Sequence, residues 1–163
     1  MDEQNELFIV VDKNDKIIGY HTRYECHHNK QLIHRAIGVV VFNDKGQTLL
    51  QKRSKNKDTY PGFYTISTSG HVDKGETYKQ AAQRELFEEL GIHSSLTRRK
   101  KFITEMEVET EMDCVFTTLF NGPFYPNKDE IDKIKFVTKE QLKKMQKKLT
   151  PFATTSVKEL GLL

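Results

Sequence analysis

Three glutamates lie close together in the middle of the chain: Glu85, Glu88 and Glu89. On a helix, residues spaced i, i+3 and i+4 share one face, so these carboxylates would form one strip of surface. Like charges at this spacing cost an isolated helix about 0.2 to 0.5 kcal/mol per pair, a cost that a bound cation removes. Carboxylate oxygens favour Mg²⁺ or Mn²⁺, which can keep sites open for phosphate oxygens. Taken alone, however, this pattern is more often a solvated acidic helix face.

A helix that would carry the three glutamates is predicted over residues 77–90. Thr77 and Gln80 have the spacing of a capping box at its start. Gly91 is a residue that commonly follows the last turn of a helix. The residues that recur every four positions and would face the core are Ala82, Leu86 and Leu90.

Short apolar runs alternate with polar turns in the rest of the chain, which is typical of strands. The first two runs indicate a hairpin, and a second pair of strands is joined by residues 43–46, whose Asn, Asp and Gly tolerate tight turns. A second capping box at residues 138–141 predicts the start of a C-terminal helix. This order of elements indicates a mixed α/β sandwich. The predicted strands are 7–11, 17–20, 36–42, 47–51, 102–107, 114–120 and 131–137.

Length and composition exclude several classes of protein. The chain has 163 residues, the size of one globular domain, and 36% of them are hydrophobic, which excludes a wholly disordered chain. No apolar run approaches the roughly 20 residues that cross a bilayer, and residues 1–5 do not resemble a secretory signal. We therefore expect a soluble cytoplasmic protein that does not bind membranes. A net charge of +3 is too small to predict a nucleic-acid partner.

Basic residues and cysteines give weaker signals. The basic runs 52–57 and 98–101 could meet phosphate groups, but such runs are more common in solvated loops. Cys26 and Cys114 stand far apart without a Cys-x-x-Cys motif. Neither a structural zinc site nor a disulfide framework is predicted, and free thiols suit a reducing cytosol.

The three glutamates belong to a longer motif over residues 70–92. This segment matches G-x5-E-x7-R-E-U-x-E-E-x-G-U at every fixed position, where U is an apolar residue. It resembles the Nudix box. The resemblance implies an α/β/α sandwich with a mixed sheet, a catalytic loop-helix and a C-terminal helix. It also implies one domain over residues 1–163, with residues 1–33 as a hairpin extension packed on it.

The resemblance to the Nudix box implies a role for each of its polar residues. The Gly70 carbonyl and the three glutamates would hold one to three Mg²⁺ or Mn²⁺ ions. Glu76 and Arg84 would form a salt bridge that supports the loop and the helix without touching substrate. The implied reaction is attack by water on phosphorus in a diphosphate linkage. Glu85 is the first candidate for the general base, and a base on a loop outside the box is the alternative.

Outside the box the chain resembles the type 1 isopentenyl-diphosphate isomerases and their hydrolase-like relatives. The resemblance is spread over most of the chain and includes Tyr60-Pro61-Gly62 and Ser69-Gly70-His71. In the isomerases three histidines and a glutamate pair bind a metal. The alternative is that such histidines are hydrogen-bonded interior residues. The residues at matching positions here are His27, His34, His71, Glu109 and Glu111.

Two departures from the isomerases favour hydrolysis. The isomerase motif has a proton-transferring Cys where this chain has Ser69, and a hydroxyl is a far poorer acid than a thiol. Isomerases often lose part of the Arg-Glu-U-x-Glu-Glu segment, which this chain retains. We therefore expect a Mg²⁺-dependent pyrophosphohydrolase acting on a nucleoside diphosphate derivative or another small organic diphosphate. The alternatives are an isopentenyl-diphosphate isomerase and a non-catalytic nucleotide- or RNA-binding module.

Substrate contacts are predicted less sharply. Arg53 and Lys57 are candidates for binding the diphosphate, since Arg offers a bidentate fork. The aromatic residues Tyr60, Phe63 and Tyr64 would either line a pocket for a flat group or fill the core. Selectivity is expected to come from three segments predicted as loops, and a homodimer is left open. These segments are 22–32, 107–113 and 122–129.

Overall fold

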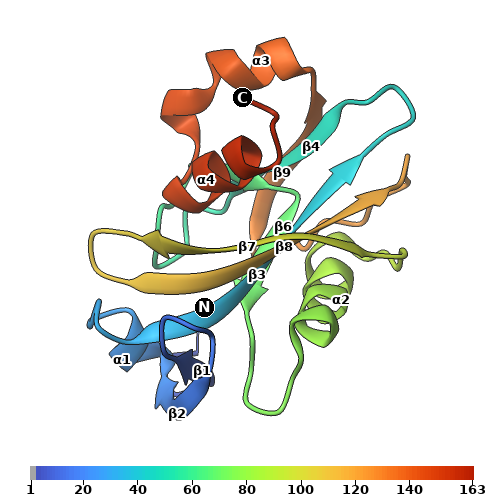
Figure 1. The fold of residues 1–163 in the computed structure, drawn as a ribbon. Coiled ribbons are helices and arrows are strands. Elements are labelled where there is room, and N and C mark those ends of the chain that lie inside the picture. Colours follow the sequence, from blue (N-terminus) through green and yellow to red (C-terminus); the bar gives the residue numbers. More distant parts are fainter. Residues whose placement is uncertain (1–2) are drawn as a thin grey trace.

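The computed structural model describes residues 3–163, in which nine strands form one mixed sheet (Figure 1). β3 (Ile33–Phe42) lies at the centre of this sheet and is buried over most of its length. β8 (Thr110–Leu119) runs parallel to β3, and β7 (Thr97–Glu105) pairs antiparallel with β8 as an edge strand. The predicted mixed α/β architecture is confirmed.

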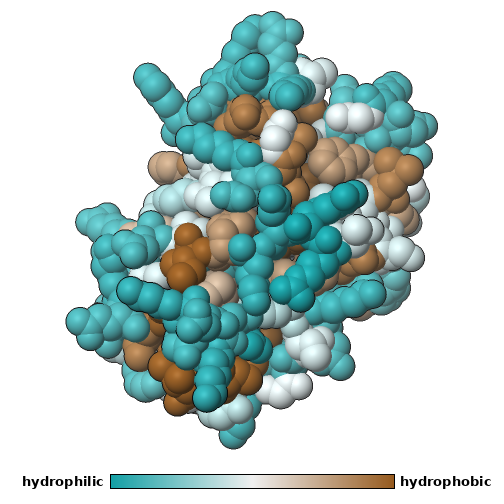
Figure 2. Space-filling view, viewed as in Figure 1, coloured by the Kyte–Doolittle hydropathy of each residue, from teal (hydrophilic) through white to brown (hydrophobic). Residues whose placement is uncertain are grey.

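The N-terminal hairpin joins the other side of β3. β1 (Leu7–Val11) and β2 (Ile17–Thr22) pair antiparallel, as predicted, and the end of β1 pairs with the start of β3. β6 (Thr68–His71) lies antiparallel to β3 directly beyond β1. Figure 2 shows apolar surface at the foot of the molecule, where the hairpin exposes Ile17 and Ile18.

The second predicted strand pair separates soon after its turn. Between β3 and β4 (Thr48–Arg53) only Phe42 and Thr48 form a cross-strand pair. β4 then pairs with β5 (Tyr64–Ile66) on one side and β9 (Ile131–Val137) on the other. Because β4 leaves β3, the central strand is free to pair with β6 and β8.

Helices cover the sheet on both faces (Figure 1). α2 (Tyr78–Leu90) packs against one face, where its core includes the odd-numbered residues of β3 from 37 to 41. α3 (Lys139–Lys144) and α4 (Pro151–Glu159) cover the other face, where the core between them and the sheet includes Val40 of β3. This three-layer arrangement follows from β3, whose alternate residues point to opposite faces and are apolar on both.

The capping box predicted at residues 138–141 is confirmed at the start of α3, but the C-terminal region holds two α-helices where one was predicted. α3 ends at Met145, a short 3₁₀ turn follows at Gln146–Lys148, and α4 begins separately after Thr150. Pro151 explains the break, because it lacks an N–H and is accommodated only in the first turn of a helix. The Thr150 hydroxyl accepts a hydrogen bond from the Ala153 amide and so starts the new helix.

Two predictions about loops are also corrected. The basic run 98–101 lies in β7 rather than in a loop, and it is exposed because β7 is an edge strand. Of the segments predicted as selectivity loops, 22–32 contains the short helix α1 (Arg23–Cys26) and 107–113 enters β8 at residue 110. Among the described residues, no helix is both long and apolar enough to cross a membrane.

Candidate active site

The helix that carries the glutamates begins and ends as predicted. The Thr77 hydroxyl accepts a hydrogen bond from the Gln80 amide, and the Gln80 side chain accepts one from Thr77 N, which completes the capping box. Gly91 has the left-handed conformation (φ 67°) that ends the helix. The fully buried stripe that anchors α2 on the sheet is Ala82, Leu86 and Leu90.

The three carboxylates differ in environment. Glu89 is 8% exposed and accepts hydrogen bonds from Gln51 Nε2 (3.2 Å), the Ser69 amide (3.2 Å) and the Thr68 hydroxyl. Glu85 is partly buried, whereas Glu88 is exposed. The helix therefore presents a graded set of oxygen ligands, with Glu89 fixed most firmly from β4 and β6.

Burial raises the pKa of two of the three carboxylates, those of Glu85 and Glu89. Burial and the nearby Glu89 carboxylate raise the pKa of Glu85 well above its ordinary value. Burial also raises the pKa of Glu89, although hydrogen bonds from Thr68 and Ser69 oppose this effect. Two buried carboxylates that repel each other are a favourable place for a divalent cation.

Gly70 lets the strand approach the helix closely. A Cβ atom at this position would lie 2.3 Å from the Glu85 carboxyl carbon. No residue with a side chain fits there unless Glu85 moves, so the glycine is required by packing. Its backbone lines the same cavity as the three glutamates.

Arg84 forms the predicted contact with Glu76 and also contacts two of the three glutamates. Its guanidinium donates to both Glu76 carboxylate oxygens at 2.7 and 2.9 Å. It also reaches Glu85 Oε1 at 2.8 Å and Glu88 Oε2 at 3.2 Å, which sequence reasoning did not foresee. Arg84 therefore supplies part of the positive charge beside two of the candidate ligands, as well as tying the loop to the helix.

A second polar cluster lies next to the first one. It combines His27 after α1, His34 of β3 and His71 of β6 with Glu109 and Glu111 at the start of β8. Glu109 Oε2 is 2.9 Å from His27 Nε2, and Glu111 Oε1 is 3.7 Å from the Nε2 atoms of both His34 and His71. The structure thus brings together all five residues that the isomerase resemblance singled out.

The chemistry of this cluster fits a metal ion. One ligand atom from each of the three histidines lies within 4.8 Å of the others, and the same holds for His34 with the two glutamates. His34 is fully buried and neither of its ring nitrogens has a hydrogen-bond partner among the described residues. A buried imidazole normally has such a partner, so the interior-residue alternative leaves His34 unexplained. Three imidazoles and two carboxylates suit a divalent transition metal.

The pKa values of two of these histidines shift in opposite directions. Although burial lowers the pKa of His27, hydrogen bonds to Asp58 and Glu109 raise it to about 9. Burial lowers the pKa of His71 well below its ordinary value. His71 therefore stays neutral, the form that binds metals. The Phe8 ring stacks on His71 at a centroid distance of 4.1 Å and fixes the plane of the imidazole.

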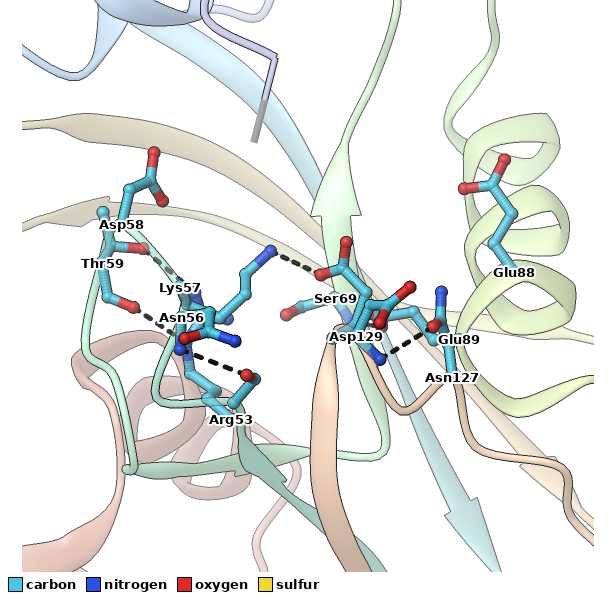
Figure 3. A network of polar contacts seen from close by, with 12 residues as sticks. Arg53, Asn56, Lys57, Asp58, Thr59, Ser69, Glu88, Glu89, Asn127 and Asp129 are labelled. Carbon is cyan, nitrogen blue, oxygen red and sulfur yellow. Dashed lines mark hydrogen bonds and ion pairs between the residues drawn. The ribbon is translucent and has the colours of Figure 1, made fainter. Parts of the chain in front are cut away.

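Both clusters open into one cavity of about 250 Å³. Figure 3 shows Arg53 and Lys57 on one side of it and Glu88 and Glu89 on the other, with Ser69 between them. Arg53 Nε donates to the Thr59 carbonyl at 3.0 Å. Lys57 Nζ lies 2.5 Å from the Glu130 carboxylate. The cavity thus places two cations opposite the carboxylates of α2.

The three aromatic candidates have different positions. Tyr60 lines the cavity, and its φ of 45° is unusual for a bulky residue. Phe63 packs against it edge to face, with 5.8 Å between centroids, and is 40% exposed. Tyr64 is buried in the core between the sheet and α4, so a pocket role for Tyr64 is wrong.

Sequence reasoning missed several residues that line the cavity. Arg23 is buried, reaches the cavity from α1 and bonds Asp58. Its position four residues before His27 could have indicated a shared helix face. Glu6 also lines the cavity, and burial together with Asp73 raises its pKa to about 7. No local sequence pattern marks Glu6, because it reaches the site only through the hairpin.

The family model of the NUDIX domain matches residues 32–160. The chain belongs to the Nudix family. It is also similar to isopentenyl-diphosphate isomerases. Isopentenyl-diphosphate Delta-isomerase I of Arabidopsis thaliana, a chloroplastic protein, is 34% identical over 86% of this chain and 57% of its own length. The isopentenyl-diphosphate delta-isomerase of Schizosaccharomyces pombe is 34% identical over 86% of this chain and 73% of its own. This Nudix chain thus spans less than two thirds of the Arabidopsis relative.

Solved structures support the same fold. DR0079 of Deinococcus radiodurans superposes with a TM-score of 0.74 and 25% identity, covering 84% of this chain and 86% of that one. The MutT protein of Methanosarcina mazei gives a TM-score of 0.67 at 23% identity, covering 74% of this chain and 87% of that one. The Nudix fold inferred from the sequence is therefore confirmed.

Proposed function

We propose that this Nudix protein is a divalent-metal-dependent hydrolase that cleaves the diphosphate linkage of a small organic diphosphate, such as a nucleoside diphosphate derivative. The observation that carries the proposal is the cavity itself. Its acidic wall is the complete glutamate trio with Gly70, and Arg53 and Lys57 lie across from it. A substrate that carries two phosphates and needs a cation is complementary to both walls.

Magnesium or manganese would be held by Glu85, Glu88, Glu89 and the Gly70 carbonyl, and would lower the pKa of water and offset phosphate charge. Arg53 and Lys57 bind the terminal phosphate oxygens and hold the linkage near the helix. Glu85 takes the proton from the attacking water on the carboxylate oxygen that Arg84 does not occupy. Burial and Glu89 raise its pKa without metal, and a bound cation would favour the ionised carboxylate, which is the form that a general base requires.

Isopentenyl-diphosphate isomerisation is the second candidate, favoured by the cluster of His27, His34, His71, Glu109 and Glu111 and by the isomerase relatives. Moving a double bond requires a group that protonates one carbon and a group that removes a proton from another. Ser69 stands in the cavity where the resemblance expects a cysteine, and its hydroxyl is a poor proton donor. This difference is the reason for ranking hydrolysis first.

One pair of assays separates the two functions. The purified protein is incubated with Mg²⁺ or Mn²⁺ and a panel of nucleoside diphosphate derivatives and other small diphosphates, and phosphate release is measured after phosphatase coupling. In parallel, isopentenyl diphosphate is incubated in deuterated water and deuterium incorporation is followed by NMR. We expect turnover in the first assay and none in the second. Deuterium exchange without hydrolysis would establish the isomerase, and ligand binding without either product would indicate a binding module.

Two variants assign the activity to a cluster. Glu89→Gln removes a ligand charge on the helix and should lower kcat/KM for hydrolysis by at least about 100-fold. His34→Gln removes a ligand of the histidine cluster and should lower bound transition metal, measured by elemental analysis, while bound Mg²⁺ is unchanged. Glu140→Gln, on the exposed face of α3, is the matched control for losing one glutamate charge. Hydrolysis that survives Glu89→Gln would contradict the proposal.

A further inference from the structure

A second cavity, of about 510 Å³, is lined by a separate set of described residues from the active-site cavity. Arg35 and Ala36 are neighbours on β3 and therefore point to opposite faces. Ala36 lines the active-site cavity, whereas Arg35 lines the second one. The other walls of this cavity are the β1–β2 hairpin, the first turn of α2 and the basic edge strand β7.

Asp15 organises the positive charge in this cavity. Its carboxylate accepts hydrogen bonds from Arg35 Nε (2.8 Å), Lys101 Nζ (2.9 Å) and the Tyr78 hydroxyl (2.7 Å). The Asp15 side chain is 7% exposed, and the three hydrogen bonds keep its pKa below the ordinary value although burial opposes them. One permanently charged carboxylate thus holds two cations in fixed positions.

Arg98 adds a third cation that no carboxylate in the described part of the chain neutralises within ion-pair distance. Its guanidinium lies over the Tyr78 ring, 5.9 Å from the centroid, beside Lys101 on the same wall. Glu76, the second carboxylate of the cavity, is bonded to Arg84. The cavity therefore carries a net positive charge, and an anion entering it meets an Arg fork and an ammonium group.

The opposite wall is aromatic and apolar. Tyr20 and Ile17 line it and are each 43% exposed, so both side chains are accessible to a ligand. Lys74 Nζ lies 4.8 Å from the Tyr20 ring centroid and adds positive charge at the rim. A cavity of this size with cations on one side and an aromatic ring on the other suits a phosphate group joined to a flat ring system.

We propose that this cavity is a second ligand site, which binds a mononucleotide with its phosphate on Arg98 and Lys101 and its base against Tyr20. The site is separate from the glutamate and histidine clusters and needs no metal. It does not depend on the proposed hydrolase activity.

The test is calorimetric titration with adenosine 5′-monophosphate in the presence of EDTA, which removes divalent ions from the active site. Arg98→Ala should weaken binding about tenfold, because a charge-assisted bidentate contact is lost. Lys100→Ala is the matched control, since Lys100 is an equally basic residue of β7 that does not line the cavity, and binding should change less than twofold. Tyr20→Leu should weaken binding of the nucleotide but not that of inorganic phosphate.

Amide chemical shifts locate the ligand without any variant. Shifts of Gly75 and Thr77 that saturate with the calorimetric affinity would support the site, whereas shifts confined to Ser69 and Gly70 would overturn it. If Arg98→Ala and Lys100→Ala weaken nucleotide binding equally, the loss of affinity reflects general surface charge, and the proposed site is also overturned. If Arg98→Ala lowers the melting temperature strongly, Lys101→Gln replaces it with the same expected loss of affinity.

Discussion

At the scale of single residues, Glu85 is the carboxylate whose ionised form a bound cation would stabilise. Its pKa is raised well above the ordinary carboxyl value by burial and by Glu89. The native state therefore binds a proton at Glu85 at pH values where the unfolded chain has released it. The contribution of Glu85 to stability is fully present below about pH 4.5 and is lost as the pH rises.

This linkage predicts how the melting temperature responds to pH and metal. In EDTA, the wild-type protein should lose stability relative to Glu85→Gln between pH 5 and pH 8, with each 1 kcal/mol lowering the melting temperature by about 2 to 4 °C. Mg²⁺ should raise the wild-type melting temperature more at pH 8 than at pH 5, because the ion replaces the proton. Differential scanning calorimetry of both proteins measures this, with Glu140→Gln as control. If the difference in melting temperature between the wild-type protein and Glu85→Gln does not change with pH, the raised pKa of Glu85 is contradicted.

Gly70 gives a second prediction at this scale. In Gly70→Ala the new methyl would meet the Glu85 carboxyl group at 2.3 Å, so the carboxylate must move. A displacement of about 1 Å in a catalytic group can cost 100-fold in rate, and we expect such a loss in metal-dependent turnover. Isothermal titration with Mn²⁺ should show weaker metal binding as well.

Gly38→Ala is the matched control for Gly70→Ala. Its Cβ would lie 2.5 Å from Ile66 Cδ1 and 2.7 Å from the Phe152 ring, which are apolar core groups. Gly38→Ala should therefore lower the melting temperature but leave Mn²⁺ affinity unchanged. If both variants lose metal affinity equally, the effect of Gly70 is general core disruption.

Some residues of the site lie in one continuous stretch of sequence, whereas others reach the site only through the fold. The glutamate trio, Gly70 and the Glu76–Arg84 pair stand in one continuous motif, so their types and spacing could be recognised in the sequence. The extra contacts of Arg84 with Glu85 and Glu88 depend on side-chain conformations that spacing does not fix. Arg23 and Glu6 reach the cavity only through the fold of the N-terminal segment.

At the scale of elements, local signals decided which predictions succeeded. α2 was predicted correctly because its cap, its apolar stripe and Gly91 all lie within fifteen consecutive positions. β5 and β6 were missed, since they are only 3 and 4 residues long, and β6 consists of Thr, Ser, Gly and His without a large apolar residue. Their pairing with β4 and β3 defines them, and pairing across such distances leaves no periodic pattern.

The C-terminal end of α2 offers a test of element packing. Gly91 has φ 67°, and a Cβ there would lie 2.8 Å from Tyr125 Cβ and 3.2 Å from the Tyr125 carbonyl oxygen. Tyr125 N donates to the Leu90 carbonyl, so the segment cannot move away without losing that bond. We expect Gly91→Ala to cost about 2 to 4 kcal/mol, from backbone strain of about 1 to 2 kcal/mol together with overpacking.

Gly46→Ala separates these two costs. Gly46 has a similar φ of 74°, but nothing lies within 4 Å of a Cβ built there. It should therefore cost only the strain of about 1 to 2 kcal/mol. Urea unfolding of both variants measures the difference in the free energy of unfolding. If both variants lose the same free energy, the segment that contains Tyr125 moves away from the new methyl group without loss of stability.

At the scale of the whole molecule, the N-terminal hairpin closes the active site. Phe8 is fully buried and stacks on His71, and His27 and Arg23 follow directly after β2. The NUDIX family model begins at residue 32, after Phe8, Arg23 and His27. The described residues before position 32 therefore supply one histidine of the histidine cluster, His27, and one cation of the cavity, Arg23. The sequence could indicate only His27.

This arrangement predicts that residues 32–163 do not fold independently. Removing the first 31 residues would expose the edge of β3 that pairs with β1, and would take away Phe8, Ile9, Val10 and Val11, each at most 2% exposed. Burying such side chains contributes roughly 1.5 to 3 kcal/mol each, so the four together contribute about 6 to 12 kcal/mol, which is comparable with the 5 to 15 kcal/mol by which a typical domain is stable. We expect the shortened chain to show poor amide dispersion by NMR and no cooperative thermal transition. A shortened chain that melts cooperatively within a few degrees of the full-length protein would show instead that the hairpin is an accessory element and would contradict this prediction.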